Sequence, residues 1–68
     1  MPTIQQLAEA MRSLRQPATC DELADRLGIA RIRAREILSS LRQRGEIEPA
    51  GVMVGKQNRW KRAKEASK

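Results

Sequence analysis

The feature that most limits what this chain can fold into is a very short connection between two predicted helices. Thr19 and Glu22 are spaced as a capping box, which opens the first of these helices, and Gly28 stands where that helix ends. Only about three residues later a second helix is predicted, from about Arg31 to Arg44. Two helices joined by so short a glycine-containing turn cross steeply, so this segment predicts a helix-turn-helix.

Another helix is predicted before this pair, from about Ile4 to Arg15. Thr3 and Gln6 are spaced as its capping box, and Pro17 ends it. Apolar residues that recur at helical spacing are expected to bury one face of each helix. In chain order these are Ile4, Leu7, Ala8, Met11, Leu14, Leu23, Ala24, Leu27, Ala34, Ile37, Leu38 and Leu41.

After Gly45 the apolar pattern changes to the alternation that is typical of strands. Residues 52–54 and 58–62 flank a break at 55–57, which predicts a two-stranded hairpin, and Pro49 confines the first strand to an edge or a bulge. We expect Trp60 to face inward and cover the open side of the helical core. Residues 17–19 are expected to add a short strand at the edge of this sheet.

The predicted fold class is therefore α+β and mainly helical, with a three-helix helix-turn-helix core and a C-terminal two-stranded β-hairpin. The chain has 68 residues, which is the size of one small domain with a thin core. We assign residues 1–62 to that domain. Residues 63–68 are polar and short of apolar anchors, so we expect them to form a mobile basic tail.

The positive charge of the chain is concentrated in its second half. The whole chain has 14 Lys and Arg against 8 Asp and Glu, a net charge of +6. Residues 1–30 are slightly acidic, whereas residues 31–62 contain most of the cations and only three acids (Glu36, Glu46 and Glu48). This balance favours a polyanionic partner that docks on residues 31–62, nucleic acid before membrane. A plain solvated surface is the alternative interpretation.

Several classes of function are disfavoured by residues that the chain lacks. It has no histidine and one cysteine, Cys20, so the commonest general base is absent and one thiol makes neither an internal disulfide nor a metal site. No apolar run approaches the roughly 18 residues of a membrane span, and no signal-peptide pattern opens the chain. We expect a cytoplasmic binding protein, with no enzymatic activity, cofactor, metal, membrane role or evident small-molecule ligand.

The predicted order of helix, helix-turn-helix and basic hairpin resembles that of winged helix-turn-helix domains. The resemblance rests on Leu23-Ala24-Asp25-Arg26-Leu27-Gly28-Ile29, on Ala34, Leu38 and Leu41, on Gly45-Glu46-Ile47, and on Gly55 and Trp60. The chain looks most like the small bacterial fimbrial-operon regulators of the PapI type. It shares with them the Ala34-Arg35 pair, a glycine closing the helix, and a hairpin glycine followed by Trp. The resemblance implies a winged helix-turn-helix domain over residues 1–62 that regulates a plasmid or chromosomal pilus operon.

In such a fold the segment 31–44 is the recognition helix, which enters the major groove, and the hairpin 47–62 is the wing, on phosphates or in the minor groove. Arginine binds guanine through two hydrogen bonds or holds a phosphate, serine donates to backbone oxygens, and an exposed isoleucine meets a thymine methyl. Cations in the first turn of a helix oppose its dipole, which points to function rather than stability. The expected DNA-binding residues are Arg31, Ile32, Arg33, Arg35, Ser39, Ser40, Lys56, Arg59 and Lys61.

The predicted function is sequence-specific binding of double-stranded DNA by a small bacterial transcription regulator. The alternative is a protein-interaction adaptor that acts with a larger DNA-bound regulator and has little DNA affinity alone. RNA and single strands are less favoured partners, because the chain lacks exposed aromatic residues that stack bases. We expect a monomer in solution that gains specificity by pairing with a second copy on DNA or with a larger regulator.

Overall fold

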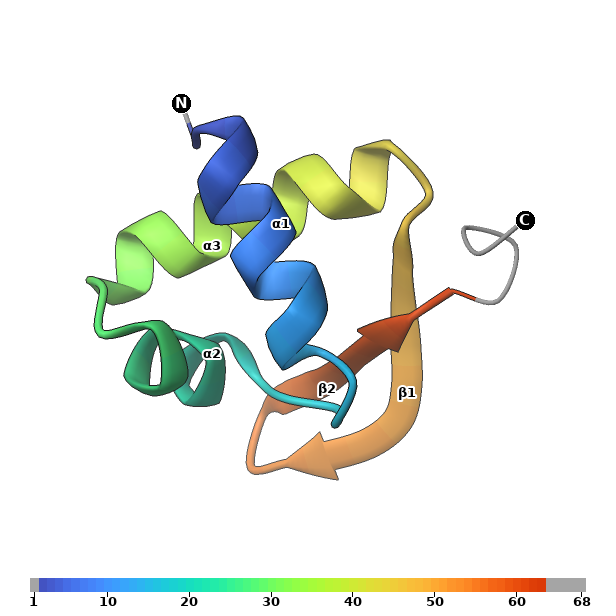
Figure 1. Ribbon diagram of the computed structural model, residues 1–68. Helices are drawn as coiled ribbons and strands as arrows, with labels where there is room; N and C mark the ends of the chain where they lie inside the picture. The colour runs from blue at the N-terminus through green and yellow to red at the C-terminus, as the bar shows by residue number, and fades with distance from the viewer. Residues whose placement is uncertain (1, 64–68) are drawn as a thin grey trace.

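The computed structural model describes residues 2–63 and confirms the predicted fold class (Figure 1). Three helices are followed by two strands: α1 (Ile4–Ser13), α2 (Cys20–Leu27), α3 (Arg31–Gln43), β1 (Ile47–Val54) and β2 (Gln57–Arg62). The strands pair as one antiparallel hairpin, which leaves the end of α3 and turns back beneath α2 in Figure 1. The fold is thus α+β and mainly helical.

The turn between α2 and α3 is built as the sequence predicts. The Thr19 hydroxyl accepts a hydrogen bond from the Glu22 N–H at 3.1 Å, and the Glu22 carboxylate accepts one from the Thr19 N–H at 2.9 Å. Gly28 has a left-handed φ of 65°, and the Ile29 N–H donates back to a carbonyl in the last turn of α2. This cap ends α2 and leaves room for only a short link before α3.

Helix α1 ends at Ser13 rather than at Arg15, and its inward face matches the predicted one only in part, since Leu7, Met11 and Leu14 pack against the core as predicted. Ile4 is 85% exposed and Ala8 is exposed, so the predicted apolar stripe was wrong at both positions. The small side chain of Ala10 is fully buried and lets α1 pack closely against the rest of the core. The contact line of α1 consequently runs through Leu7, Ala10, Met11 and Leu14.

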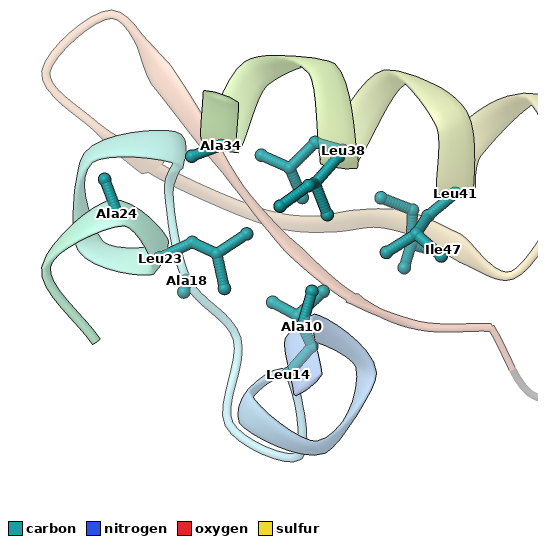
Figure 2. Packing of buried hydrophobic residues seen from close by; sticks show 10 residues of the cluster. Ala10, Leu14, Ala18, Leu23, Ala24, Ala34, Leu38, Leu41 and Ile47 are labelled. Carbon is teal, nitrogen blue, oxygen red and sulfur yellow. The ribbon is translucent and has the colours of Figure 1, made fainter. Parts of the chain in front are cut away.

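The buried core lies between the three helices and the hairpin (Figure 2). Its largest fully buried side chains are Leu14, Leu23, Ile37 and Leu41, and α1 adds the buried Ala10, so every helix contributes to it. All four residues predicted to face inward from α3 are buried, namely Ala34, Ile37, Leu38 and Leu41. The inner face of α3 is therefore committed to the core, and only its outer face is available to a partner.

Two irregularities shape the hairpin. The register of β1 against β2 shifts between Pro49 and Met53, so a bulge follows the pair of Pro49 with Trp60, and Gly51 within it has a left-handed φ of 79°. On the other edge of β2, Ala18 and Trp60 exchange two backbone hydrogen bonds of 3.1 and 2.8 Å. The expected short strand over 17–19 is thus present as a single bridge, and it ties the loop before α2 to β2.

Ordered packing reaches one residue past β2. Ala63 is 7% exposed, and its N–H donates to the carbonyl of Glu46 at 3.0 Å. The remainder of the predicted mobile tail, residues 64–68, lies outside the described residues. Helix α3 ends at Gln43 with Arg44 as its cap, one position before the predicted end.

Candidate nucleic-acid interface

An open hollow of about 740 Å³ separates the outer face of α3 from β2. It is bordered on one side by α3 and on the other by the strand of the hairpin that returns to the core. We call it the α3–β2 hollow. Its lining residues are Cys20, Asp21, Arg31, Ile32, Arg35, Leu38, Ser39, Arg42, Gln57, Asn58 and Trp60.

The α3 side of this hollow carries three arginines on one flank of the helix. Arg31, Arg35 and Arg42 are four and seven residues apart, and such spacings place side chains on the same face of an α-helix. Ile32 lies beside them and is 72% exposed. A solvated isoleucine next to three cations is a surface suited to a partner that offers both negative charge and apolar groups.

Four of the six predicted residues of α3 line the hollow, and two do not. Arg31, Ile32, Arg35 and Ser39 line it. Arg33 donates instead to the Glu36 carboxylate at 3.0 Å, outside the hollow lining. Ser40 is half-buried, and it lies seven residues after Arg33 on that same flank. The structure therefore brings together only part of the predicted set.

The three predicted cations of the wing, residues 47–62, lie outside the lining of the hollow. Lys56 is exposed in the turn between β1 and β2. The Arg59 guanidinium makes two hydrogen bonds to the Glu22 carboxylate, at 3.1 and 3.2 Å. The Lys61 ammonium lies 3.4 Å from the Glu48 carboxylate on the neighbouring strand. Two of the three wing cations are thus already paired with acids.

Seven of the eleven residues that line the hollow were not among the predicted site residues, and four of these seven have charged or amide side chains. Arg42 lies over the Trp60 ring, 5.2 Å from its centre. Its place seven residues after Arg35 on the same helical face was a usable signal. Gln57 and Asn58 carried no comparable signal, because their position depends on the register of the hairpin. Asp21 was not among the predicted site residues, and its contacts with α3 and β2 were not predicted.

Two adjacent acids at the start of α2 contact both α3 and β2. Asp21 accepts hydrogen bonds from Arg31 of α3 and, at 3.1 Å, from Gln57 of β2. Its neighbour Glu22 holds Arg59. The hydrogen bonds from Arg59, followed by that from the Thr19 N–H, keep the pKa of Glu22 below its ordinary range. The start of α2 therefore connects α3 to the wing.

Cys20 lies at the edge of the hollow, where its thiol is 3.5 Å from the Arg31 carbonyl oxygen. Burial, and next the charge of Asp21, raise the pKa of this thiol above its ordinary value of 9.0, against smaller opposing effects of Arg35 and Arg31. These effects disfavour the thiolate form of Cys20.

No cluster of His, Cys, Asp and Glu within residues 2–63 is arranged to hold a metal ion. In the same part of the chain, every helix is too short or too polar to cross a membrane.

Comparison with known proteins assigns the family. The model of the FaeA-like protein family matches residues 5–63, which include all three helices and both strands except the first residue of α1. The chain therefore belongs to the FaeA-like family, a family of small fimbrial regulators. Searches of the curated proteins and of the solved structures found no significant match to the chain.

Proposed function

We propose that this chain is a bacterial fimbrial-operon transcription regulator that acts in the cytoplasm by binding double-stranded DNA. Helix α3 enters the major groove with Arg31, Ile32, Arg35 and Ser39 toward the bases and the adjacent backbone. The wing lies along the phosphates or the minor groove through Lys56, Arg59 and Lys61. Arg33 and Ser40 are proposed to contact the duplex from the other flank of α3.

The observation that supports this proposal best is the row of arginines beside the hollow. A duplex has phosphates on both sides of its major groove, and a helix placed in that groove brings the cations on its flank close to one strand. Arg35 makes no ion pair within residues 2–63, so its guanidinium is available in the free domain. Lys56 is equally unpaired in the described part of the chain.

The test is a titration of fluorescent duplex with the protein over a range of salt concentrations. If about five cations each neutralise one phosphate, the slope of log K against log salt is near −4 to −5. Selection of bound sequences from a random duplex pool supplies the cognate site. A slope close to zero contradicts duplex binding.

Two substitutions separate the roles of α3 and the wing. Arg35→Ala is expected to weaken binding to the selected site more than binding to random duplex, by about 1–3 kcal/mol. Lys56→Ala is expected to weaken both duplexes alike and to reduce the salt slope by about one. Arg12→Ala is the matched control, because it removes the same charge from the exposed surface of α1. If all three variants bind alike, the interface is wrongly assigned.

A second candidate function is favoured by the state of the predicted cations. Arg31, Arg33, Arg59 and Lys61 are each in an ion pair with an acid of the same chain. An interface in which four of the six predicted cations are paired has a reduced attraction for phosphates. This observation fits an adaptor that joins a larger regulator already bound to DNA and has little affinity for the duplex alone. In the titration, such an adaptor binds only when that regulator is present.

A further inference from the structure

The Asp21 carboxylate uses both of its oxygens on residues of the candidate interface. Its Oδ1 lies 3.4 Å from Nη1 of Arg31, at the start of α3. Its Oδ2 accepts a hydrogen bond of 3.1 Å from Nε2 of Gln57, at the start of β2. Asp21 of α2 thus binds the Arg31 guanidinium of α3 and the Gln57 amide of β2, the two elements that border the hollow.

We propose that Asp21 is an internal competitor of the DNA backbone, which a phosphate displaces before Arg31 and Gln57 can hold the duplex. Carboxylate and phosphate oxygens both accept hydrogen bonds from a guanidinium, so one anion can take the place of the other. The proposal deepens the proposed function and rests on duplex binding. It makes Asp21 a residue that lowers affinity, although it touches the same side chains as the ligand.

The geometry of the pair makes this exchange feasible. The Arg31 side chain is 74% exposed and the Asp21 side chain 43%, so water and ions reach both groups. Exposed ion pairs of this kind change an equilibrium by up to about fivefold. Neither side chain takes part in the cap of α2, which is formed by Thr19 and Glu22. Displacement of Asp21 therefore leaves the helix start intact.

The neighbouring pair of Glu22 and Arg59 has a different role. Glu22 receives two hydrogen bonds from Arg59 and a third from the Thr19 N–H, so its release would also open the cap. It holds the wing to α2. Within residues 2–63, the Asp21 side chain hydrogen-bonds only to Arg31 and Gln57 and takes no part in the cap, so it can be displaced without opening the helix start. For this reason Asp21 is the residue to test.

The competition has a sequence-independent signature. Removing the carboxylate charge frees Arg31 for a phosphate on any duplex, so affinity rises alike for selected and random sequences. The salt slope stays close to that of wild type, because Arg31 neutralises the same phosphate in both complexes. A general loss of negative charge raises affinity less, because it does not remove an ion pair that must break on binding.

The experiment measures duplex affinity of Asp21→Asn against wild type, in salt series, on the selected site and on random duplex. Asp25→Asn is the matched control, since it removes the same charge from the exposed surface of the same helix and makes no ion pair within residues 2–63. Asp21→Asn is expected to bind about three- to fivefold more tightly, and Asp25→Asn less than about twofold. Asp21→Ser serves as a second variant, and thermal unfolding checks that each variant folds.

Arg31→Ala supplies the decisive background. In the Arg31→Ala background, the gain in affinity from Asp21→Asn is expected to fall to that from Asp25→Asn, because there is no Arg31 guanidinium left to release. An undiminished effect in that background overturns the proposal, as does an Asp21→Asn affinity equal to wild type. Both outcomes leave the proposed function standing. Absence of salt-dependent binding by wild type and every variant contradicts duplex binding by the chain alone, and the competitor proposal with it.

Discussion

The guanidinium of Arg42 lies 5.2 Å from the centre of the Trp60 ring, so the last turn of α3 rests against β2. A cation at this distance from an indole is attracted by the ring, by roughly 0.5–1 kcal/mol at an exposed site. Trp60 also packs against the core and exchanges backbone hydrogen bonds with Ala18. Contacts with α3, with the core and with the loop before α2 therefore meet at one residue of the wing.

Replacing Trp60 with alanine is expected to destabilise the domain severely. The change removes a large side chain from the edge of the core, which lowers the free energy of unfolding by about 3 kcal/mol. That is most of the stability of a domain this small, which is about 3–5 kcal/mol. Urea unfolding followed by circular dichroism measures the loss. Ile4→Ala is the control, because Ile4 is 85% exposed, and equal midpoints for the two variants would contradict the role given to Trp60.

The two capping boxes are expected to differ in their contribution to stability. Thr19 is 3% exposed and opens the helix that positions the turn, whereas Thr3 is exposed at the start of α1. Loss of a cap costs about 0.5–2 kcal/mol, with the larger cost where the freed N–H groups are shielded from water. Thr19→Ala should therefore lower the free energy of unfolding by about 2 kcal/mol and Thr3→Ala by about 0.5 kcal/mol. Thermal unfolding of the two variants measures this difference. Thr19→Ser should be about as stable as wild type, because serine keeps the capping hydroxyl.

The ion pair of Glu22 with Arg59 predicts a change in stability at acid pH. Hydrogen bonds from Arg59 hold the pKa of Glu22 in the folded chain below its ordinary value of 4.5. A carboxyl with a lowered folded pKa stabilises the fold above the unfolded pKa, and this contribution is lost as the pH falls through the folded pKa. Below a pH of about 4.5, the melting temperature of wild type should fall more steeply than that of Glu22→Gln.

Glutamine at position 22 can still form the capping box, so this variant isolates the charge. Glu9→Gln, which changes an exposed acid of α1, is the control and should keep the wild-type slope. Parallel curves for wild type and Glu22→Gln would show that the pair with Arg59 does not form in solution.

Cys20 is expected to react slowly with thiol reagents. Burial raises the pKa of its thiol, and the thiolate is the reactive form. Alkylation at neutral pH should therefore be slower in the folded protein than in the same chain unfolded in urea. Saturating duplex should slow it further, because Cys20 lines the α3–β2 hollow. Mass spectrometry of the alkylated chain measures these rates. Equal alkylation rates in folded and unfolded protein would contradict the burial of Cys20.

The scaffold was predictable because its signals are local. The capping box of Thr19 and Glu22 marks the start of α2, and Gly28 marks its end. Each signal lies within one helical turn of the end that it marks. The inward face of α3 followed from apolar spacing alone. The face of α1 followed only in part, because alanine at positions 8 and 10 gives no preference between two rotations of the helix. Close packing of α1 around Ala10 decides that choice.

The site was less predictable because its contacts join residues far apart in the sequence. Glu22 and Arg59 are 37 residues apart, and Asp21 and Gln57 are 36 apart. Such pairs depend on where the hairpin docks against α2, which no local pattern encodes. The sequence places most of the positive charge on α3 and on the hairpin. It did not reveal that several of their cations are already bound by acids.

The bridge between Ala18 and Trp60 has a consequence for the order in which the protein becomes functional. During synthesis, Ala18 is made before α2, whereas its partner is made only after all three helices. Until β2 arrives, the core lacks its Trp60 cover and the loop before α2 has no partner strand. Domains fold as units, so a partly synthesised chain does not yet present α3 on a firm support. A chain that ends before β2 is therefore expected not to fold into the complete domain.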